Sequence, residues 1–311
     1  MKLVKVSCPQ GDPRRWGELL RQSPNSKGIW DDYQFVFNED IDECDYWVVY
    51  DQIPKTETCK CSPRNTIFIT GEPPSLGAYP QSFLNQFALV ITCHKDITGL
   101  HMQEMHPWIV NRTYDELKSM PIERKFNMVS LITTLKHKRR YNAALKFQEA
   151  LPYISMYGEG INSVWDKWDA HAAFRYSIVM ENEKADDLFT EKLTDCYLAW
   201  TYPFYYGCSN IGDYFPKGSY TEIDIEDPVS AVNTILKTIA NPEHYPKALP
   251  KISMARLLCL DYYNFYPAII HAIETIPAGG KKEMVTISDK GRFVKDKTMF
   301  LKKIYRMVQE M

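Results

Sequence analysis

The stretch from Met180 to Gly207, "MENEKADDLFTEKLTDCYLAWTYPFYYG", decides the fold. A strand predicted over 176–182 ends at its start, a helix follows over 190–200, and a second strand covers 202–207. Strands that alternate with helices are typical of a parallel sheet. The helix carries a lysine, Lys192, in its first turn, where the helix dipole disfavours a cation by roughly 0.3–1 kcal/mol. This lysine therefore predicts an anion at the helix start.

The residues beside Lys192 suit a phosphate. Glu181 and Asn182 follow the first strand, Thr190 can cap the helix, and Glu191 precedes the lysine. The unpaired N–H groups of a helix start bind phosphate, and a lysine adds a point charge. In the alternative interpretation, Lys192 extends into solvent and Glu191 is an ordinary acid of the first turn. Spacing alone leaves both interpretations open.

The alternation of strands and helices continues outward in both directions. The second half predicts strands over 126–132, 153–160, 176–182, 202–207 and 219–224, with helices over 138–151, 163–175, 190–200 and 227–240. The first half predicts strands over 2–8, 33–37, 46–50, 66–71 and 88–93. The fold class is therefore α/β, with two Rossmann-like domains that face a cleft suited to two substrates.

The domain borders follow from a segment without a clean period, 107–124, which we interpret as the connection. We predict an N-terminal domain over 1–115, a C-terminal domain over 116–280 and a helical tail over 281–311. The tail is basic and amphipathic, which favours a helix packed on the protein. Such a helix can also contact a membrane surface, which is the alternative.

Composition narrows the class of protein. The 311 residues carry a net charge of −2, which gives no reason to expect non-specific binding of nucleic acid. The eight cysteines of so long a chain are not a disulfide framework, so we expect reduced thiols. Neither a signal peptide nor an apolar run of about 18 residues is present, which predicts a cytoplasmic protein.

The whole run 174–228 resembles the donor-binding signature of the α-1,3-fucosyltransferases, family 10 of the glycosyltransferases. The matching elements are Glu181–Asn182, Thr190–Glu191–Lys192 and the strand ending at Gly207. Three positions depart from that signature. Leu188, which Phe189 follows, replaces the aromatic residue before Thr-Glu-Lys, Met180 replaces Phe, and Tyr206 replaces Trp.

The resemblance extends to flanking segments. In the basic turn 136–140 it implies an arginine that contacts the donor diphosphate, with Arg140 preferred and Arg139 next. It also places Tyr157 and Gly158, at a strand end, beside the donor. In "TGEPPS" it implies that Glu72 is the catalytic base, and His94 is a candidate acceptor contact.

The resemblance implies an inverting glycosyltransferase of the GT-B type that moves fucose from GDP-fucose to a glycan hydroxyl. Glu72 takes the acceptor proton, while Arg140 and Lys192 stabilise the departing diphosphate. Glu181, Glu191 and Asn182 hold sugar hydroxyls or phosphate. No metal or other cofactor is obligatory. The alternatives are a transferase of this fold that uses another sugar nucleotide, because of Leu188, and a catalytically silent glycan-binding or assembly protein.

Three further patterns carry less weight. Asp40 and Asp42 have the form of a metal-binding carboxylate pair but lie in an acidic stretch that favours a solvated turn. Cys59 and Cys61 lack a second ligand pair for zinc. The spacing of His94, His101 and His106 fits no standard metal site.

Overall fold

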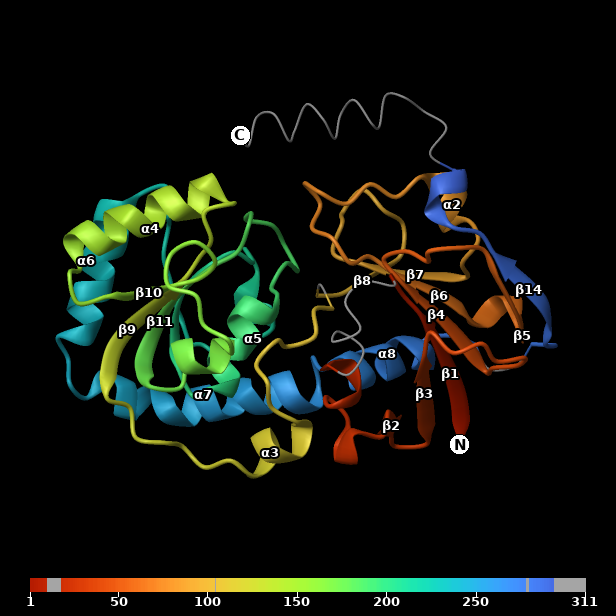
Figure 1. The fold of residues 1–311 in the computed structure, drawn as a ribbon, viewed down its shortest axis with the longest axis horizontal. Coiled ribbons are helices and arrows are strands. Elements are labelled where there is room, and N and C mark those ends of the chain that lie inside the picture. The colour runs from red at the N-terminus through yellow and green to blue at the C-terminus, as the bar shows by residue number, and fades with distance from the viewer. Residues whose placement is uncertain (10–17, 104, 278–279, 294–311) are drawn as a thin grey trace. The chain divides into compact units, whose positions relative to one another are not determined.

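The computed structural model describes residues 1–9, 18–103, 105–277 and 280–293, and Figure 1 shows its ribbon. The chain divides into two compact units. The first contains residues 1–107, 113–115 and the described residues from 263 on; the second contains 108–112 and 116–262. Each unit holds one main sheet.

The first unit is built on a seven-stranded sheet in the order β2-β3-β1-β4-β6-β7-β8. All neighbouring strands are parallel except β2 and β3, which are antiparallel. The predicted strands at 2–8, 33–37, 46–50, 66–71 and 88–93 are all present. The strands are β1 (Lys2–Ser7), β2 (Ile29–Trp30), β3 (Tyr33–Phe37), β4 (Tyr46–Tyr50), β6 (Thr66–Ile69), β7 (Leu89–Thr92) and β8 (Leu100–His101).

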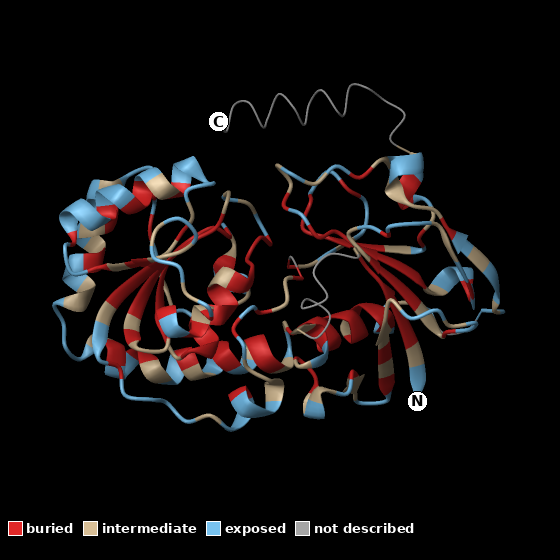
Figure 2. Cartoon of the chain, in the orientation of Figure 1, coloured by how far each residue is buried: buried red, intermediate tan, exposed pale blue. Residues whose placement is uncertain are grey.

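The central strands of this sheet are buried on both faces, as Figure 2 shows in red. Successive side chains of a strand point to opposite faces. Ile67 and Ile69 therefore belong to one core cluster and Phe68 to the other. The helix α8 (Phe265–Glu274) fills the first cluster with Phe265, Tyr266 and five further apolar residues of its length.

The second face is covered by a small antiparallel sheet. In it β5 (Glu57–Cys61) pairs with β14 (Glu283–Ile287), and the short helix α2 (Gln81–Leu84) lies against the same core. The prediction of a helical tail is therefore wrong for 283–287, which form a strand, and the rest of that tail from 294 lies outside the described residues. Alternation explains the strand, because Val285 and Ile287 face the core while Met284 is exposed.

The second unit is built on a parallel sheet of five strands in the order β10-β9-β11-β12-β13. Strand β10 lies on one side of β9, and all later strands lie on the other. The sequence of strands therefore reverses between β9 and β11, which makes their carboxyl ends a topological switch point. The strands are β9 (Asn127–Ile132), β10 (Ser155–Tyr157), β11 (Phe174–Met180), β12 (Tyr202–Tyr206) and β13 (Thr221–Glu222).

Three predicted helices of this unit are present. They are α4 (Lys138–Ala150), α5 (Glu191–Leu198) and α6 (Pro228–Ile239), and Asp227 caps the last of these with Pro228 in its first turn. The predicted helix over 163–175 is wrong. The Asp166 side chain accepts a hydrogen bond from the Trp168 N–H at 2.9 Å and closes a short 3-10 turn, Lys167–Ala170, before β11 begins.

Several elements were not predicted from sequence, among them two helices. Helix α7 (His244–Asp261) contains Pro250, and α3 (Tyr114–Ser119) lies inside the predicted connection 107–124. The prediction also gave residues 263–280 to the second domain, whereas α8 packs into the first sheet. The first unit is therefore discontinuous in sequence.

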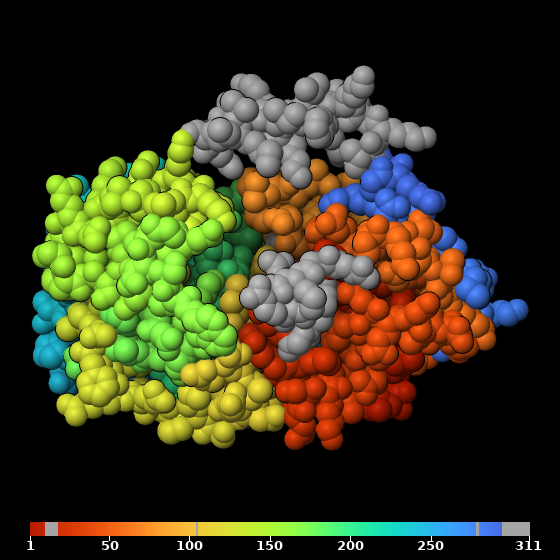
Figure 3. Space-filling view, viewed as in Figure 1, coloured from red at the N-terminus to blue at the C-terminus, as the bar shows by residue number. Residues whose placement is uncertain are grey.

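The chain between β9 and β11, yellow-green in Figure 3, forms much of the surface of the second unit on the face shown. Within the described ranges, no helix combines the length and apolar character that crossing a membrane requires. All eight cysteines lie in described residues, and each is buried and outside any disulfide.

Candidate active site

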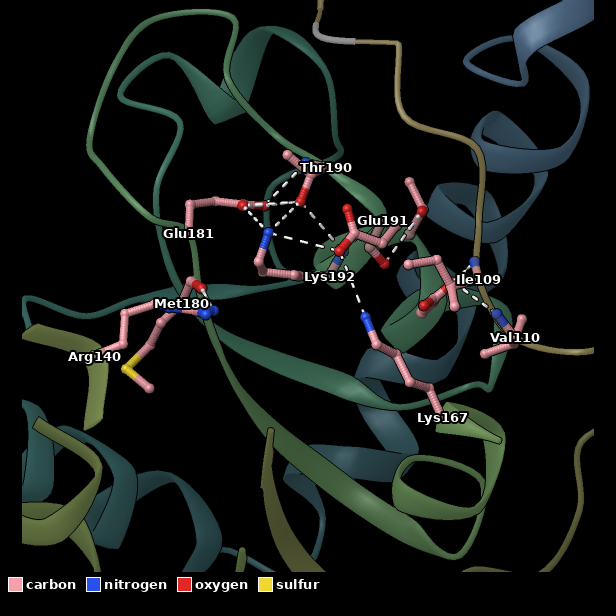
Figure 4. Close-up of polar contacts among 11 residues, drawn as sticks. Ile109, Val110, Arg140, Lys167, Met180, Glu181, Thr190, Glu191 and Lys192 are labelled. Atoms are coloured by element: carbon pink, nitrogen blue, oxygen red, sulfur yellow. Dashed lines mark hydrogen bonds and ion pairs between the residues drawn. The ribbon is translucent and has the colours of Figure 1, made fainter. Parts of the chain in front are cut away.

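The start of α5 is organised by the carboxylate of Glu181, which is 1% exposed at the end of β11 (Figure 4). It accepts hydrogen bonds from the Thr190 N–H at 2.9 Å and the Thr190 hydroxyl at 2.8 Å. The Lys192 ammonium donates to Glu181 at 3.1 Å and to the Thr190 hydroxyl at 2.9 Å. Strand β11 and helix α5 are thus joined by one buried polar cluster.

The charge of Lys192 is balanced by two carboxylates. Its side chain is 21% exposed, and its ammonium lies 3.7 Å from Glu191, which Lys167 also approaches at 3.4 Å. Burial disfavours the charged lysine, but Glu181 and Glu191 outweigh that effect and hold the pKa of Lys192 above its usual value. Lys192 therefore remains an ammonium ion in this cluster.

The anion that the sequence predicts at this helix start is thus supplied by the chain itself. Glu181 lies at the positive end of the α5 dipole, and Lys192 compensates its charge. The interpretation that Lys192 extends into solvent is wrong, since its ammonium turns back onto Glu181.

The start of α4 differs from the start of α5 in the charge of its side chains. Its first turn holds Lys138, Arg139 and Arg140 with no acidic residue, and Lys136 precedes its N-cap. In the described part of the chain, the N-cap His137 makes no side-chain capping hydrogen bond. Burial together with Arg140, Lys192 and Lys136 lowers the pKa of His137, which indicates a positive field at this end of the helix.

Several buried polar atoms converge on the switch point between β9 and β11. Four of them have no hydrogen-bond partner among the described residues: Thr133 Oγ1, Thr134 Oγ1, Asn182 Oδ1 and Arg140 Nε. Arg140 is 5% exposed, and its Nη1 donates to the Met180 carbonyl at 3.1 Å, which directs the guanidinium to the end of β11. Thr133 is 1% exposed. An unpaired buried polar group costs about 1–3 kcal/mol, so this group of atoms indicates a polar ligand.

Backbone geometry at the two predicted glycine positions is constrained by close approach. A Cβ on Gly158 would lie 1.6 Å from the Thr133 carbonyl oxygen, and its φ of +134° favours glycine. A Cβ on Gly207 would lie 2.4 Å from Glu181 Cγ. Both glycines therefore allow a strand end to approach a residue of the candidate site. Tyr157, beside Gly158, packs its ring edge-on against Phe174.

We expect Gly158→Ala to lower the free energy of unfolding by at least about 2 kcal/mol, since it combines an unfavourable φ with a clash against main chain. Chemical denaturation followed by circular dichroism measures this. The matched control is Gly218→Ala, which also has a positive φ of +90° but meets nothing closer than a lysine methylene at 3.9 Å. Equal losses in the two variants would contradict the steric explanation.

The contacts of Arg139 and Leu188 differ from those that the sequence predicts. The Arg139 guanidinium donates to Glu226 at 2.6 Å and to the hydroxyl of Tyr206, so it is directed to the ends of β12 and β13 rather than to the switch point. Leu188 is 1% exposed in the core, and its carbonyl accepts from Tyr205. Leu188 therefore fills a packing position.

Helix α5 also binds the main chain of residues 109–110, which belong to the second unit. Asp195 accepts hydrogen bonds from the N–H groups of Ile109 at 3.0 Å and Val110 at 3.4 Å (Figure 4). Burial raises the pKa of this carboxyl to about 7. Asp166 binds the next two residues, since it accepts from the Asn111 N–H at 3.1 Å and lies 3.3 Å from the Arg112 guanidinium.

In the first unit, Glu72 is exposed in the loop that follows β6. Its N–H donates to the Tyr79 hydroxyl at 3.2 Å, and its carbonyl oxygen lies 2.8 Å from His94 Nε2. A carbonyl can only accept, so this nitrogen carries the proton. His94 is 3% exposed, and its ring also packs edge-on against the ring of Tyr79. The structure thus groups two predicted residues, Glu72 and His94.

Three residues of interest were not predicted from the sequence. Thr133 and Thr134 follow β9, and their position after a strand at a switch point was a usable signal. Tyr79 carried no signal, because its contacts with Asp51 and Lys290 depend on how separate segments of the first unit pack. In the described part of the chain, no three His, Cys, Asp or Glu side chains gather closely enough to hold a metal ion, and Asp40 and Asp42 are exposed.

Solved structures with the same architecture include glycosyltransferases. An α1,3-fucosyltransferase with GDP-fucose has a TM-score of 0.55 and 16% identity, over 91% of this chain and 92% of that one. The same type of enzyme with GDP has a TM-score of 0.52 and 15% identity, over 85% and 92%. An α-glucosyltransferase with UDP has a TM-score of 0.50 and 8% identity, over 88% and 100%.

These similarities show the fold. The chain has the two Rossmann-like domains of the GT-B glycosyltransferase type, as the alternation of strands and helices predicted. Neither a protein-family model nor a curated protein sequence matches the chain.

Proposed function

We propose that this protein is an inverting glycosyltransferase that moves fucose from GDP-fucose to a hydroxyl group of a glycan. The observation that carries the proposal is the set of unpaired buried polar atoms at the switch point, beside the basic start of α4. Helix N-termini and arginine forks are suited to a diphosphate. A sugar nucleotide is the substrate class that brings a diphosphate to a fold of this type.

The choice of donor rests on the motif resemblance. Glu181–Asn182 and Thr190–Glu191–Lys192 stand in the order of the fucosyltransferase signature, and a fucosyltransferase with GDP-fucose is among the proteins of similar fold. A protein with UDP is also among them, so a transferase with a uridine donor is the alternative to be tested.

The reaction is a single displacement. The acceptor oxygen attacks the anomeric carbon of fucose while Glu72 takes the proton from the acceptor hydroxyl. The bond between that carbon and the diphosphate oxygen breaks, and the leaving diphosphate gains negative charge. Arg140 and the N–H groups at the start of α4 supply positive charge for the leaving group. Thr133, Thr134 and Asn182 offer hydrogen bonds to the same ligand.

A thermal-shift panel tests the donor. GDP and GDP-fucose should raise the melting temperature, because a ligand of the folded state stabilises it by about 2.7 kcal/mol at a hundredfold excess over Kd. UDP at the same concentration should produce a much smaller shift. Equal shifts for GDP and UDP would remove the guanine assignment, and a response to UDP alone would favour the alternative donor. No response to any sugar nucleotide would contradict a transferase and favour a silent protein.

A further inference from the structure

The loop that carries Glu72 is held by residues that come from four separate parts of the first unit. We call Asp51, Gly71, Glu72, Tyr79 and Lys290 the Tyr79 cluster. Asp51 follows β4, Gly71 and Glu72 follow β6, Tyr79 precedes α2, and Lys290 follows β14. The cluster lies at the carboxyl end of the sheet, where parallel α/β sheets bind their ligands.

The hydroxyl group of Tyr79 is at the centre of this cluster. It accepts hydrogen bonds from the N–H groups of Gly71 at 3.0 Å and Glu72 at 3.2 Å, and it donates to Asp51 Oδ1 at 2.8 Å. A phenol has one proton and two lone pairs, so these three bonds use its full capacity. The donation to a carboxylate strengthens the oxygen as an acceptor for the two N–H groups.

Asp51 is itself held in an unusual conformation. Its φ is +60°, which is uncommon for a residue other than glycine, and its N–H donates to the Ile69 carbonyl at 2.8 Å. The ammonium of Lys290 lies 3.9 Å from Asp51 and 4.6 Å from the centre of the Tyr79 ring. The C-terminal segment thus places a cation against both members of the hydrogen-bonded pair.

His94 and Gly77 also contact the main chain of Glu72. His94 donates to the Glu72 carbonyl at 2.8 Å, so both backbone polar groups of Glu72 are occupied. A Cβ on Gly77 would lie 2.9 Å from the His94 ring, 2.9 Å from the Tyr79 ring and 3.0 Å from the Glu72 carbonyl oxygen. The main chain of Glu72 is therefore enclosed while its side chain is exposed.

We propose that Tyr79, oriented by Asp51 and Lys290, is a positioning residue that holds the main chain of Glu72 so that its exposed carboxylate meets the acceptor at a fixed place. This inference rests on the proposed function, in which Glu72 is the base. A general base works within a hydrogen-bond distance of the proton that it takes. A displacement of about 1 Å can lower a rate on the order of 10²-fold. A hydroxyl without contact to substrate thus controls the rate.

The test uses the full chain with Tyr79→Phe, which keeps the ring in its packing against Phe68 and removes the hydroxyl. Two quantities are measured. The first is hydrogen exchange of the backbone amides in segment 70–73. The second is release of GDP from GDP-fucose with water as the acceptor. Tyr46→Phe on the same sheet is the matched control, and Glu72→Gln is measured beside them.

We expect the Gly71 and Glu72 amides to exchange about tenfold faster in Tyr79→Phe, because each loses its hydrogen-bond acceptor. GDP release should fall by at least about tenfold. Affinity for GDP should not change, because the proposed nucleotide site is in the other unit. A role limited to stability would lower the melting temperature without this separation of turnover from affinity. Tyr46→Phe should match the parent protein in every measurement.

Two outcomes would overturn the inference. Unchanged exchange in segment 70–73 would show that Tyr79 does not hold Glu72. Faster exchange with full turnover, while Glu72→Gln loses turnover, would overturn the positioning role and leave the base intact. If Glu72→Gln itself keeps its turnover, the base and the inference both fail. Should Tyr79→Phe not fold, Lys290→Met is measured in the same way, with Arg292→Met in the same turn as its control.

Discussion

Glu72→Gln should lower the turnover of the proposed reaction by about 10²–10⁴-fold, since general base catalysis contributes that factor. Glutamine keeps the size of the side chain but cannot accept a proton at neutral pH. Glu72 is exposed, so the substitution should leave the melting temperature almost unchanged. GDP affinity should be retained. Turnover is measured as GDP release under saturating GDP-fucose.

Glu39→Gln is the matched control, because Glu39 is also an exposed glutamate just beyond a strand of the same sheet. It should retain the full rate. A Glu72→Gln protein with most of its turnover would remove this residue from the mechanism. Loss of GDP binding in that variant would assign Glu72 to the donor side instead.

Arg140→Met should weaken binding of GDP by about 10- to 150-fold, which corresponds to roughly 1.5–3 kcal/mol for a charge-assisted hydrogen bond. The physical reason is that Arg140 is the buried cation at the switch point, with an unpaired Nε among the described residues. Methionine fills much of the same volume, so packing around α4 is kept. Isothermal titration with GDP measures the change.

Lys146→Met provides the comparison, since it removes the same charge from an exposed position on the same helix. It should change the GDP affinity less than twofold. Similar losses in both variants would indicate a long-range charge effect. A Kd that stays within twofold in Arg140→Met would contradict the proposed diphosphate contact.

Most strands of the two sheets follow from sequence, because parallel strands covered on both faces are short apolar runs. "YWVVY" and "TIFIT" are examples of this pattern. Strand β5 was missed because its sequence, "ETCKC", is largely polar on one side and depends on β14, which is more than 200 residues away. A local sequence pattern does not indicate a partner that lies so far along the chain.

Helix α7 was missed for a different reason. Proline inside a helix removes a hydrogen bond and costs about 3 kcal/mol, so Pro250 disfavours a continuous helix here. Burial of Ile252, Cys259 and Leu260 against the second unit outweighs that cost. Here tertiary packing overrides a local signal.

The candidate site, too, was predicted from sequence only in part. Motif order pointed to Glu181, Thr190 and Lys192, which the structure groups within hydrogen-bond distance. It did not reveal that Lys192 pairs with Glu181, because the distance between two side chains depends on how β11 and α5 pack. Thr133 and Thr134 emerge only when the order of strands is known.

The position of α8 has a consequence for folding during synthesis. The sheet of the first unit needs Phe265, Tyr266 and Ile269 to cover Val4, Val6 and Ile67, so its core is incomplete until helix α8 has left the ribosome. Residues 116–262 can complete their own core earlier. A fragment that ends near residue 115 would expose the apolar face that α8 covers and should aggregate. The unit made first is therefore the unit completed last.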